Sequence, residues 1–308
     1  MATIASPYTF ANMDGNLRLA AILHNEVSLL LADRASLYRH EAVMDFGDIA
    51  GTGSETIRVP LLGIDGYDTM SSRNESTAPA SETALTYTVP EITVARYVLQ
   101  RGISDLASMT NAGGGPSLEI LVRDFVGAFE MTVTSQICDL FGSFSNSVGT
   151  ATVDLSVDDF FAAIFQLQST STNGRPLAVL APVQVSDLQS SIRQEGGALQ
   201  YVAATQEMLR AKGQGYAGEF AGVDIFKSSK VGTNTGREGG MWVRGAIGYC
   251  EGRMSAVPGM LDARVQANGP IVIDVDRNFG DTSSLIGNAY FGVATLQQDM
   301  AVLIETDA

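Results

Sequence analysis

Hydrophobic and polar positions alternate over an unusually long stretch of the chain, "SETALTYTVPEITVARYVLQRG", at residues 81–102. Leu85, Tyr87 and Val89 share one parity, which predicts a β-strand, and after Pro90 the apolar parity switches, which predicts a bulge or bend. If most of this stretch is one extended element, it spans roughly 60 Å, whereas a compact domain of this length has a radius of gyration of about 19 Å. The pattern therefore predicts an arm that packs on a surface outside its own core, on a neighbouring subunit.

A second alternating stretch, "SETIRVPLLGI" at residues 54–64, is the predicted partner of the first. Ile57, Val59 and Leu61 alternate, and Pro60 interrupts the stretch as Pro90 interrupts the first. A proline cannot donate to a strand ladder, so both strands belong at an edge or in an isolated pair. The polar linker between them completes a predicted hairpin.

Helical spacing dominates two segments of the first half. Residues 16–38 predict an amphipathic N-terminal helix, and three glycines in "GDIAGTGSE" end it. The segment "NAGGGPSLEILVRDFVGAFEMTVTSQICDLFGS" predicts the longest helix, with Pro116 in its first turn and Glu119 at its positive end. Its apolar residues recur at spacings of three or four: Leu118, Val122, Phe125, Phe129, Val133, Ile137 and Phe141.

The second half predicts mixed α and β structure. Helices are expected at "SVDDFFAAIFQLQS", with Ser156 as N-cap, and at "PVQVSDLQSSIRQ". Strands are expected at "RPLAVLAP", "GVDIFKSSKV", "GGMWVRGAIGYCEG" and "GPIVIDVD", and the chain ends in two strands joined by the polar turn "LQQD". The fold class predicted is α+β.

Charge and cysteine content narrow the class of protein. The chain has 34 acidic and 19 basic residues, a formal net charge of −15, and such a surface repels phosphate backbones. Cys138 and Cys250 are too few for a disulfide framework and are expected to be buried thiols. With no secretory signal pattern and no uninterrupted apolar window of membrane-spanning length, the sequence predicts a soluble intracellular protein kept reduced.

Candidate chemistry is weak throughout, and no catalytic, cofactor or metal site is predicted. His24 and His40, the only histidines, lie in or just after the N-terminal helix and are interpreted as incidental helix-surface residues. "GYAGEFAG" has the wrong spacing for a phosphate loop, so its glycines are interpreted as turns. "GTNTGREGG" is interpreted as a mobile connection at a surface or symmetry axis, and Trp242 as a core residue.

Two acid pairs are the remaining candidates for a chemical role. Asp158 and Asp159 favour a helix N-terminus, and Asp274 and Asp276 fit the solvent face of a strand. Hard-metal binding by either pair stays open but is not specifically indicated, since neither matches an EF-hand pattern.

The order of these elements resembles the tailed-phage major capsid protein. The residues that carry the resemblance are "ETIRVPLLGIDGYDT" with "SETALTYTVPEITVARYVLQRGISDLA" for an extended loop, "GPSLEILVRDFVGAFEMTVTSQI" for a spine helix, "GYAGEFAGVDIFKSSKV" for an axial-domain strand, and "WVRGAIGYCEGRM" with "VDRNFGDTSSLIGNAYFGVATLQQDMAVLIET" for the closing region. The similarity extends over most of the chain from about residue 55.

The resemblance implies a division into five segments. These are an N-terminal arm and helix (1–53), an extended β-hairpin loop (54–97), a peripheral domain with the spine helix (98–153), a mixed α/β axial domain (154–268) and closing strands that return to the peripheral domain (269–308).

It also implies how subunits meet, because the extended loop of that family reaches over an adjacent subunit. The expected inter-subunit residues are Ile57, Arg58, Val59, Leu61, Arg73, Leu85, Tyr87, Val89 and Arg96. The three arginines are either partners in inter-subunit ion pairs or charges that keep an exposed edge soluble.

The partners implied are copies of the same chain, in pentamers and hexamers of an icosahedral virion shell assembled in the host cytoplasm. The resemblance also implies a portal at one vertex and enclosed double-stranded DNA that is held without sequence-specific binding. It implies no membrane partner. No lysine precedes Lys212, so the arm cannot supply the lysine of an isopeptide bond, and a non-covalent shell is expected, reinforced by a decoration protein. Because only about fifty residues precede the arm, a separate scaffolding protein is expected, with the N-terminal helix a candidate for docking it or for lining the shell wall.

Three alternatives remain open from the sequence. The first is an encapsulin-type compartment with the same fold and a protein cargo. The second is a secreted or surface β-rich binding module, against which the spine helix and the absent signal peptide count. The third is an enzyme with an unrecognised site.

Overall fold

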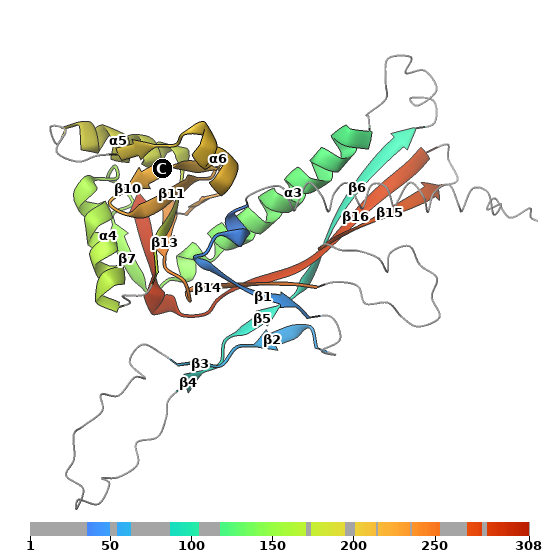
Figure 1. The fold of residues 1–308 in the computed structure, drawn as a ribbon, viewed down its shortest axis with the longest axis horizontal. Coiled ribbons are helices and arrows are strands. Elements are labelled where there is room, and N and C mark those ends of the chain that lie inside the picture. Colours follow the sequence, from blue (N-terminus) through green and yellow to red (C-terminus); the bar gives the residue numbers. More distant parts are fainter. Residues whose placement is uncertain are drawn as a thin grey trace, which may run out of the picture.

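The computed structural model describes residues 36–49, 54–62, 87–104, 118–170, 174–194, 201–213, 215–234, 236–252, 270–278 and 282–307. Figure 1 shows a rounded body that contains helices α4, α5 and α6, and beside it an elongated body in which helix α3 runs along strands β6, β15 and β16. Strands β2 to β5 project from the elongated body as an arm. The mixed α/β content agrees with the predicted fold class; the five segment boundaries remain a prediction.

The rounded body is built on an eight-stranded sheet of order β7-β17-β13-β8-β11-β10-β9, with β12 paired to β13. Its strands are β7 (Asn146–Gly149), β8 (Leu177–Leu180), β9 (Tyr201–Ala203), β10 (Tyr216–Phe220), β11 (Val223–Lys227), β12 (Gly232–Thr233), β13 (Arg237–Trp242) and β17 (Ala301–Thr306). All four residues of β8 are buried, Leu177 and Val179 in one apolar cluster and Ala178 and Leu180 in another. A central strand that is apolar on both faces needs cover on both sides.

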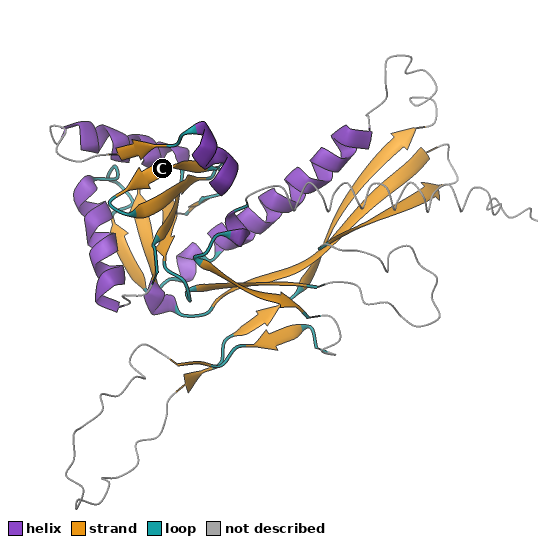
Figure 2. Cartoon of the chain, in the orientation of Figure 1, coloured by secondary structure: helices purple, strands orange, loops and turns teal. Residues whose placement is uncertain are grey.

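Helices supply that cover, as Figure 2 shows in purple against the orange strands. α4 (Val157–Thr170) and α5 (Pro182–Gln194) share a cluster with one face of the sheet, and α6 (Gln206–Lys212) lies near β10. Both longer helices and the core position of Trp242 confirm predictions, as does the cap of α4, where the Ser156 hydroxyl accepts the Asp159 N–H at 3.1 Å. Asp158 and Asp159 occupy the first turn of α4, also as predicted.

The elongated body has a five-stranded sheet in which β1, β14, β16 and β15 follow one another and β6 also pairs with β16. Its strands are β1 (Val43–Asp48), β6 (Ala95–Ser104), β14 (Ile247–Glu251), β15 (Ile271–Asn278) and β16 (Thr282–Thr295). Residues 282–289 of β16 pair with β6 and with β15, so this long strand is the centre of the body.

Helix α3 (Leu118–Asp139) confirms the predicted spine. Over 22 residues it runs about 33 Å, and the predicted stripe faces inward, with Val122, Phe125, Phe129, Val133 and Ile137 all buried. Phe141 is also buried, in the short 3-10 turn η3 (Phe141–Ser143) that follows α3. None of the described helices is long and apolar enough to cross a membrane.

The arm is a hairpin of two short antiparallel ladders. β2 (Thr56–Arg58) pairs with β5 (Glu91–Thr93), and β3 (Leu61–Leu62) pairs with β4 (Tyr87–Thr88). The two prolines separate the ladders, and there the Val59 N–H donates to the Pro90 carbonyl at 3.0 Å. Residues 87–104 are thus three strands and not one extended element: β4 and β5 are separated at Pro90, where a bulge or bend is predicted, and β5 and β6 are separated at Val94.

Other differences from the predicted elements concern which sheet a strand joins and where turns lie. "GGMWVRGAIGYCEG" is two strands in different sheets, β13 and β14, and the closing strands β16 and β17, linked through the 3-10 turn η5 (Gln298–Met300), are likewise divided between the sheets. Most of "GYAGEFAG" is strand β10, with its turn at Ala221 and Gly222, and "GTNTGREGG" contains β12 and the start of β13. Most of the predicted N-terminal helix lies outside the described residues; Leu37–Arg39 form the 3-10 turn η1.

Candidate functional site

The arm and the apolar side chains exposed around it are the candidate functional site. Within the described part of the chain, no cluster of three or more histidine, cysteine, aspartate or glutamate side chains is arranged to hold a metal ion. Cys138 and Cys250 are free and buried, as predicted, and burial raises the pKa of Cys138 to about 12 and that of Cys250 to about 11. Both thiols therefore stay protonated at neutral pH.

The base of the arm belongs to the chain's own core. Val59 and Ile92 are buried in a small cluster with Cys250 and Leu296, and Ile57 and Leu61 pack against this cluster. Ile57 lies directly opposite Ile92 in the β2–β5 ladder. These three predicted contact residues, Ile57, Val59 and Leu61, thus anchor the arm within the subunit.

A glycine lets β5 approach the sheet this closely. A Cβ added at Gly292 of β16 would overlap the carbonyl oxygen of Thr93 in β5. A backbone atom cannot swing away as a flexible side chain can, so any larger residue at 292 must separate the base of the arm from the sheet. The direction in which the arm leaves the sheet therefore depends on position 292 having no side chain.

Farther out, the arm exposes its apolar residues. Tyr87 is 58% exposed and Val89 is 41% exposed, although both are large hydrophobic residues. Leu85 and Arg73, two further predicted contact residues, lie outside the described residues. Tyr87 and Val89 are therefore the apolar predicted contacts that the described part of the arm leaves uncovered within one subunit.

The other two predicted contact arginines, Arg58 on the arm and Arg96 on β6, have partners in the same chain. Arg58 pairs with Glu91 across the β2–β5 ladder, its Nε 2.8 Å from Oε1, with both side chains well exposed. Arg96 donates from Nη2 and Nε to the Asn288 side-chain oxygen at 2.6 and 3.0 Å. An exposed pair of this kind contributes little to stability, so Arg58 fits a role in keeping the arm's edge soluble.

Further large apolar residues are exposed on other elements. They are Val98 on β6, Ile120 and Met131 on α3, Val153 before α4, Phe161 and Phe165 on α4, Val183 on α5 and Val202 on β9. Phe165 is 72% exposed, the highest value among them. Apolar residues scattered singly over a surface are ordinary, so only those that lie next to one another point to a contact surface.

The α4 pair is a surface that the sequence interpretation missed. The buried residues of α4 include Phe160, Ile164 and Leu167, and at 3.6 residues per turn Phe161 and Phe165 fall on the flank of this buried face. Phe161 also packs against the buried Phe220, with ring centroids 5.7 Å apart, whereas Phe165 is 72% exposed. Two phenylalanines at the border of the apolar face of an amphipathic helix are the sequence signal that identifies this surface.

A buried carboxylate holds the N-terminal segment on the rounded body. Asp224 of β11 has a side chain only 2% exposed, and Lys212 of α6 donates to its two oxygens at 2.6 and 2.8 Å. Arg175 lies 2.9 Å from Oδ1 and also pairs with Glu219, and the Tyr216 hydroxyl donates to Asp224 at 3.3 Å. Several donors thus offset the desolvation of one carboxylate.

His40 is part of this cluster, and its interpretation as a helix-surface residue is wrong. Its side chain is 10% exposed, with Nε2 3.3 Å from Asp224 Oδ2. The Ala42 N–H donates to Nδ1 at 3.2 Å, so Nε2 carries the proton and donates it to Asp224. Burial lowers the pKa of His40, against the opposing effect of Asp224. His24 lies outside the described residues.

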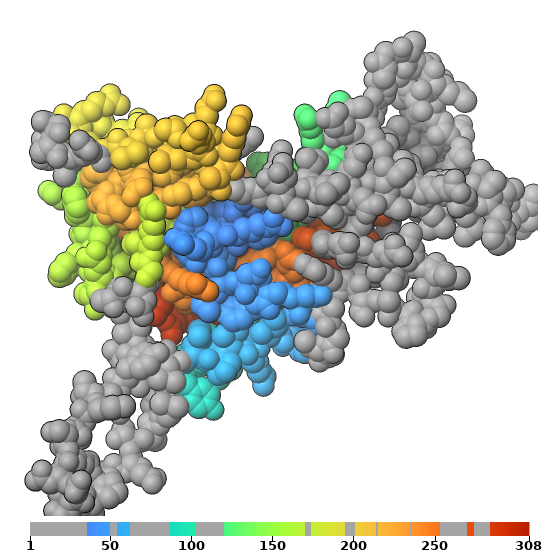
Figure 3. All heavy atoms as spheres, in the orientation of Figure 1, coloured from blue at the N-terminus to red at the C-terminus, as the bar shows by residue number. Residues whose placement is uncertain are grey.

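Figure 3 shows where residues 36–49 lie on the surface of the molecule. The blue atoms of residues 36–49 lie against the yellow atoms around α6. On the other side, the Ser36 hydroxyl donates to Glu130 of α3 at 2.8 Å, and Tyr38 packs edge-on against Phe129. The segment therefore joins the two bodies.

Sequence comparison finds no protein-family model and no curated protein that matches this chain. Solved structures do match. The capsid of the cyanophage P-SCSP1u aligns with a TM-score of 0.59 at 12% identity, covering 89% of this chain and 88% of that one. The SrpI encapsulin of Synechococcus elongatus aligns with a TM-score of 0.60 at 12% identity, covering 85% and 84%. A structure of Mycobacterium phage Che8 aligns with a TM-score of 0.55 at 13% identity, covering 82% and 85%. The chain has the capsid fold of tailed phages.

Proposed function

We propose that this protein is the major coat subunit of a tailed bacteriophage, which assembles through pentamers and hexamers into an icosahedral shell around double-stranded DNA. The observation that carries the proposal is a capsid fold matched over nearly the whole length of both chains. The role is structural, not catalytic.

The arm supports this role because its two parts are built differently. The base is fixed in the chain's own core, whereas Tyr87 and Val89 present apolar surface to solvent. A fixed base directs the outer part towards a neighbour, and burial of its apolar residues there gives a favourable contact of modest size. Many modest contacts hold a closed shell together, while each one alone stays reversible, so misplaced subunits can leave during assembly.

The charge of the chain suits a container for DNA. A net charge of −15 disfavours tight binding to phosphate, so DNA is enclosed without being held by the wall. With no lysine before Lys212, the arm contributes no lysine cross-link, and the shell is non-covalent. Its expected partners are a separate scaffolding protein, a decoration protein and a portal at one vertex, and the assembled location is the virion.

An encapsulin-type compartment is the second candidate. It is favoured by the alignment with the Synechococcus elongatus encapsulin, whose TM-score is level with that of the cyanophage capsid. The two candidates differ in contents and size, since a compartment encloses a protein cargo and a phage head encloses DNA.

Negative-stain electron microscopy of the purified, concentrated chain tests both. Closed shells, rings of five or six, or curved sheets are expected, and particle diameter together with nuclease-protected DNA or co-purified protein separates the phage head from the compartment. If the chain stays monomeric even with the cognate scaffold supplied, the coat role is refuted.

A further inference from the structure

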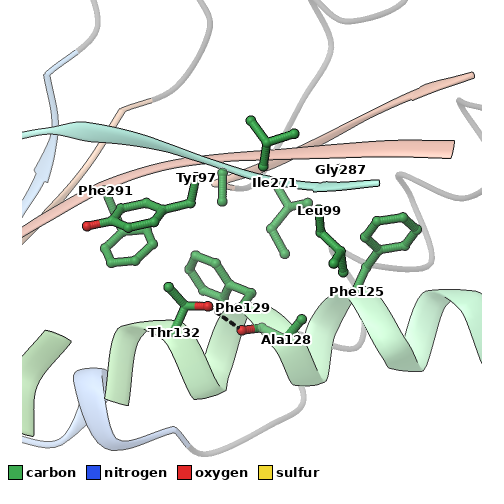
Figure 4. Close-up of a pocket in the computed structure, with 11 residues that line it drawn as sticks. Tyr97, Leu99, Phe125, Ala128, Phe129, Thr132, Ile271, Gly287 and Phe291 are labelled. Atoms are coloured by element: carbon green, nitrogen blue, oxygen red, sulfur yellow. Dashed lines mark hydrogen bonds between the residues drawn. The ribbon is translucent and has the colours of Figure 1, made fainter. Parts of the chain in front are cut away.

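Residues 36–49 hold the two bodies together through contacts of two different kinds. On the elongated body the contacts are aromatic: Tyr38 packs edge-on against Phe129 of α3, with ring centroids 5.8 Å apart, and lies tilted on Tyr249 of β14 at 4.8 Å. Figure 4 shows Phe129 rising from α3 towards Phe291 of the sheet, which it meets edge-on at 5.4 Å. Burial raises the pKa of Tyr38 to about 12 and also raises the pKa of Tyr249, so these contacts carry no charge at pH 5 to 7.

On the rounded body the same segment makes a contact that can titrate. The His40 ring lies edge-on to Phe226 of β11, with ring centroids 5.7 Å apart, and donates from Nε2 to Asp224 at 3.3 Å. Its Nδ1 accepts the Ala42 N–H at 3.2 Å, so both ring nitrogens of the neutral imidazole have partners. A second proton would have to go to Nδ1, where it would face that N–H and break the bond. The contact therefore fits the neutral form of His40.

The charges around this contact are balanced while His40 is neutral. The groups that face His40 or its partner Asp224 are Glu41 beside it, Lys212 of α6, Arg175 before β8, and Tyr216 and Glu219 of β10. Lys212 and Arg175 supply two cations, and Asp224 and Glu219 supply two carboxylates. Glu41 is exposed, so water screens it. A proton on His40, whose side chain is 10% exposed, would add an unbalanced positive charge to a buried site.

We propose that the contact between His40 and Asp224 is an acid-sensitive latch, which holds residues 36–42 on the rounded body at neutral pH and releases them in mild acid. In the open state the imidazole is in water and takes up a proton with an ordinary pKa of about 6.5, whereas the closed state disfavours that proton. Lowering the pH below this value therefore favours opening, by up to about 25-fold between pH 7 and pH 5 if the closed state binds no proton. Tyr38 stays on the elongated body, so the joint between the bodies loosens while each stays folded. The latch belongs to the single subunit and does not depend on the coat function proposed above.

Hydrogen exchange of the unassembled chain, followed by mass spectrometry at pH 7 and pH 5, tests the proposal. The peptide over residues 37–43 contains the Ala42 amide that His40 protects. Its exchange rate, divided at each pH by the rate of the same amides in an unstructured peptide, reports how often the latch opens. This normalised rate is expected to rise severalfold, and at most about 25-fold, from pH 7 to pH 5, while that of residues 125–133 of α3 stays constant. No rise over residues 37–43 overturns the proposal, as does an equal rise in α3, which would mean that the whole chain unfolds.

Two histidine variants locate the proton. His40→Gln keeps an amide donor for Asp224 but does not titrate, so its normalised rate over residues 37–43 is expected to be the same at both pH values. His24→Gln removes the only other histidine of the chain and is expected to keep the full rise. Equal rises in His40→Gln and the unmodified chain overturn the proposal.

A second measurement does not depend on the folding of His40→Gln. In the His24→Gln chain, His40 is the single imidazole, so its proton NMR signal can be followed through a pH titration without overlap. The midpoint is expected below 6.5, because the closed state disfavours the proton. A midpoint at or above 6.5 overturns the proposal.

Discussion

At the scale of single residues, Gly292 has the clearest consequence for the arm. Replacement by alanine places a methyl group on the Thr93 carbonyl, so β5 must move away from β16. Overpacking of this kind typically costs about 1 to 3 kcal/mol of unfolding free energy, and we expect the upper half of that range because backbone is displaced. Urea unfolding followed by the fluorescence of Trp242, the only tryptophan and a buried one, measures the loss.

The matched control is Gly102→Ala in β6. A Cβ there meets nothing within 4 Å, so its unfolding free energy is expected to change by well under ~1 kcal/mol. Equal losses in the two variants would contradict the role assigned to Gly292.

His40 predicts a dependence of stability on pH. Burial lowers its pKa from the ordinary value of 6.5, while Asp224 and Glu41 act to raise it and Lys212 to lower it. Between pH 7 and pH 5 the unfolded chain takes up a proton at this position before the folded chain does, so the unfolding free energy falls as the pH falls. Above the ordinary pKa both states are neutral, and this effect disappears.

The variant His40→Gln keeps an amide donor facing Asp224 and does not titrate. Its urea midpoint is expected to fall less between pH 7 and pH 5 than that of the unmodified chain. If both midpoints fall equally, His40 does not contribute to the pH dependence.

Residue-scale prediction succeeds where local spacing decides the outcome. The spacing of Val122, Phe125 and Phe129 alone identifies the buried face of α3, because residues three or four apart lie on the same face of a helix. His40 could not be identified in this way, since its burial depends on Asp224, 184 residues along the chain. Nothing in the sequence around either residue indicates that pairing.

At the scale of elements, the arm is the part most directly open to test. Tyr87→Ser removes apolar surface that is exposed in the single subunit, so Tm of the unassembled chain is expected to stay within about 1 °C, because exposed substitutions rarely change stability. If Tyr87 is buried against a neighbour on assembly, as proposed, shell yield is expected to fall severalfold. Thr88→Ser, at the adjacent exposed position, is the control, and equal yields from the two variants would argue against the arm contact.

Charge reversal at Arg73, in the linker of the predicted hairpin, is a separate test. If Arg73 forms an inter-subunit ion pair, Arg73→Glu impairs shell yield while the chain still folds. Lys230→Glu makes the same change in charge at an exposed turn of the rounded body and is expected to leave the yield unchanged. Sedimentation velocity resolves shells from free subunits, and normal shells from Arg73→Glu would remove this residue from the interface.

The helices and strands themselves could be predicted better than which strands pair with one another. Most predicted helices and strands are present, and the two prolines correctly indicated that the strands of the arm form isolated pairs. Sheet membership could not be predicted: β13 and β14 follow each other closely yet join different sheets. Strand pairing is decided by non-local contacts such as those with β17 and β16, and local alternation carries no information about them.

At the scale of the whole molecule, the order of elements was sufficient to predict the capsid fold even without a recognisable motif. The cyanophage capsid aligns over 89% of this chain at only 12% identity, so very different residues are compatible with the same fold. The fold tolerates such differences because the packing of a core accepts many different apolar side chains as long as their total volume and their pattern along the chain are kept. The exposed phenylalanines of α4 were missed because a fold-level resemblance does not specify surfaces.

The charge of −15 on every subunit makes a prediction about assembly as a whole. Subunits of like charge repel, and salt shortens the range of that repulsion from about 14 Å at 0.05 M to about 4 Å at 0.5 M, as the Debye length falls. If apolar contacts hold the shell, the protein concentration at which shells appear in light scattering is expected to fall as sodium chloride is raised over this range. Sucrose, which is excluded from protein surfaces without screening charge, is expected to have a smaller effect. A threshold that rises with salt would instead mean that ion pairs between subunits, such as one through Arg73, contribute more to assembly than the burial of Tyr87 and Val89.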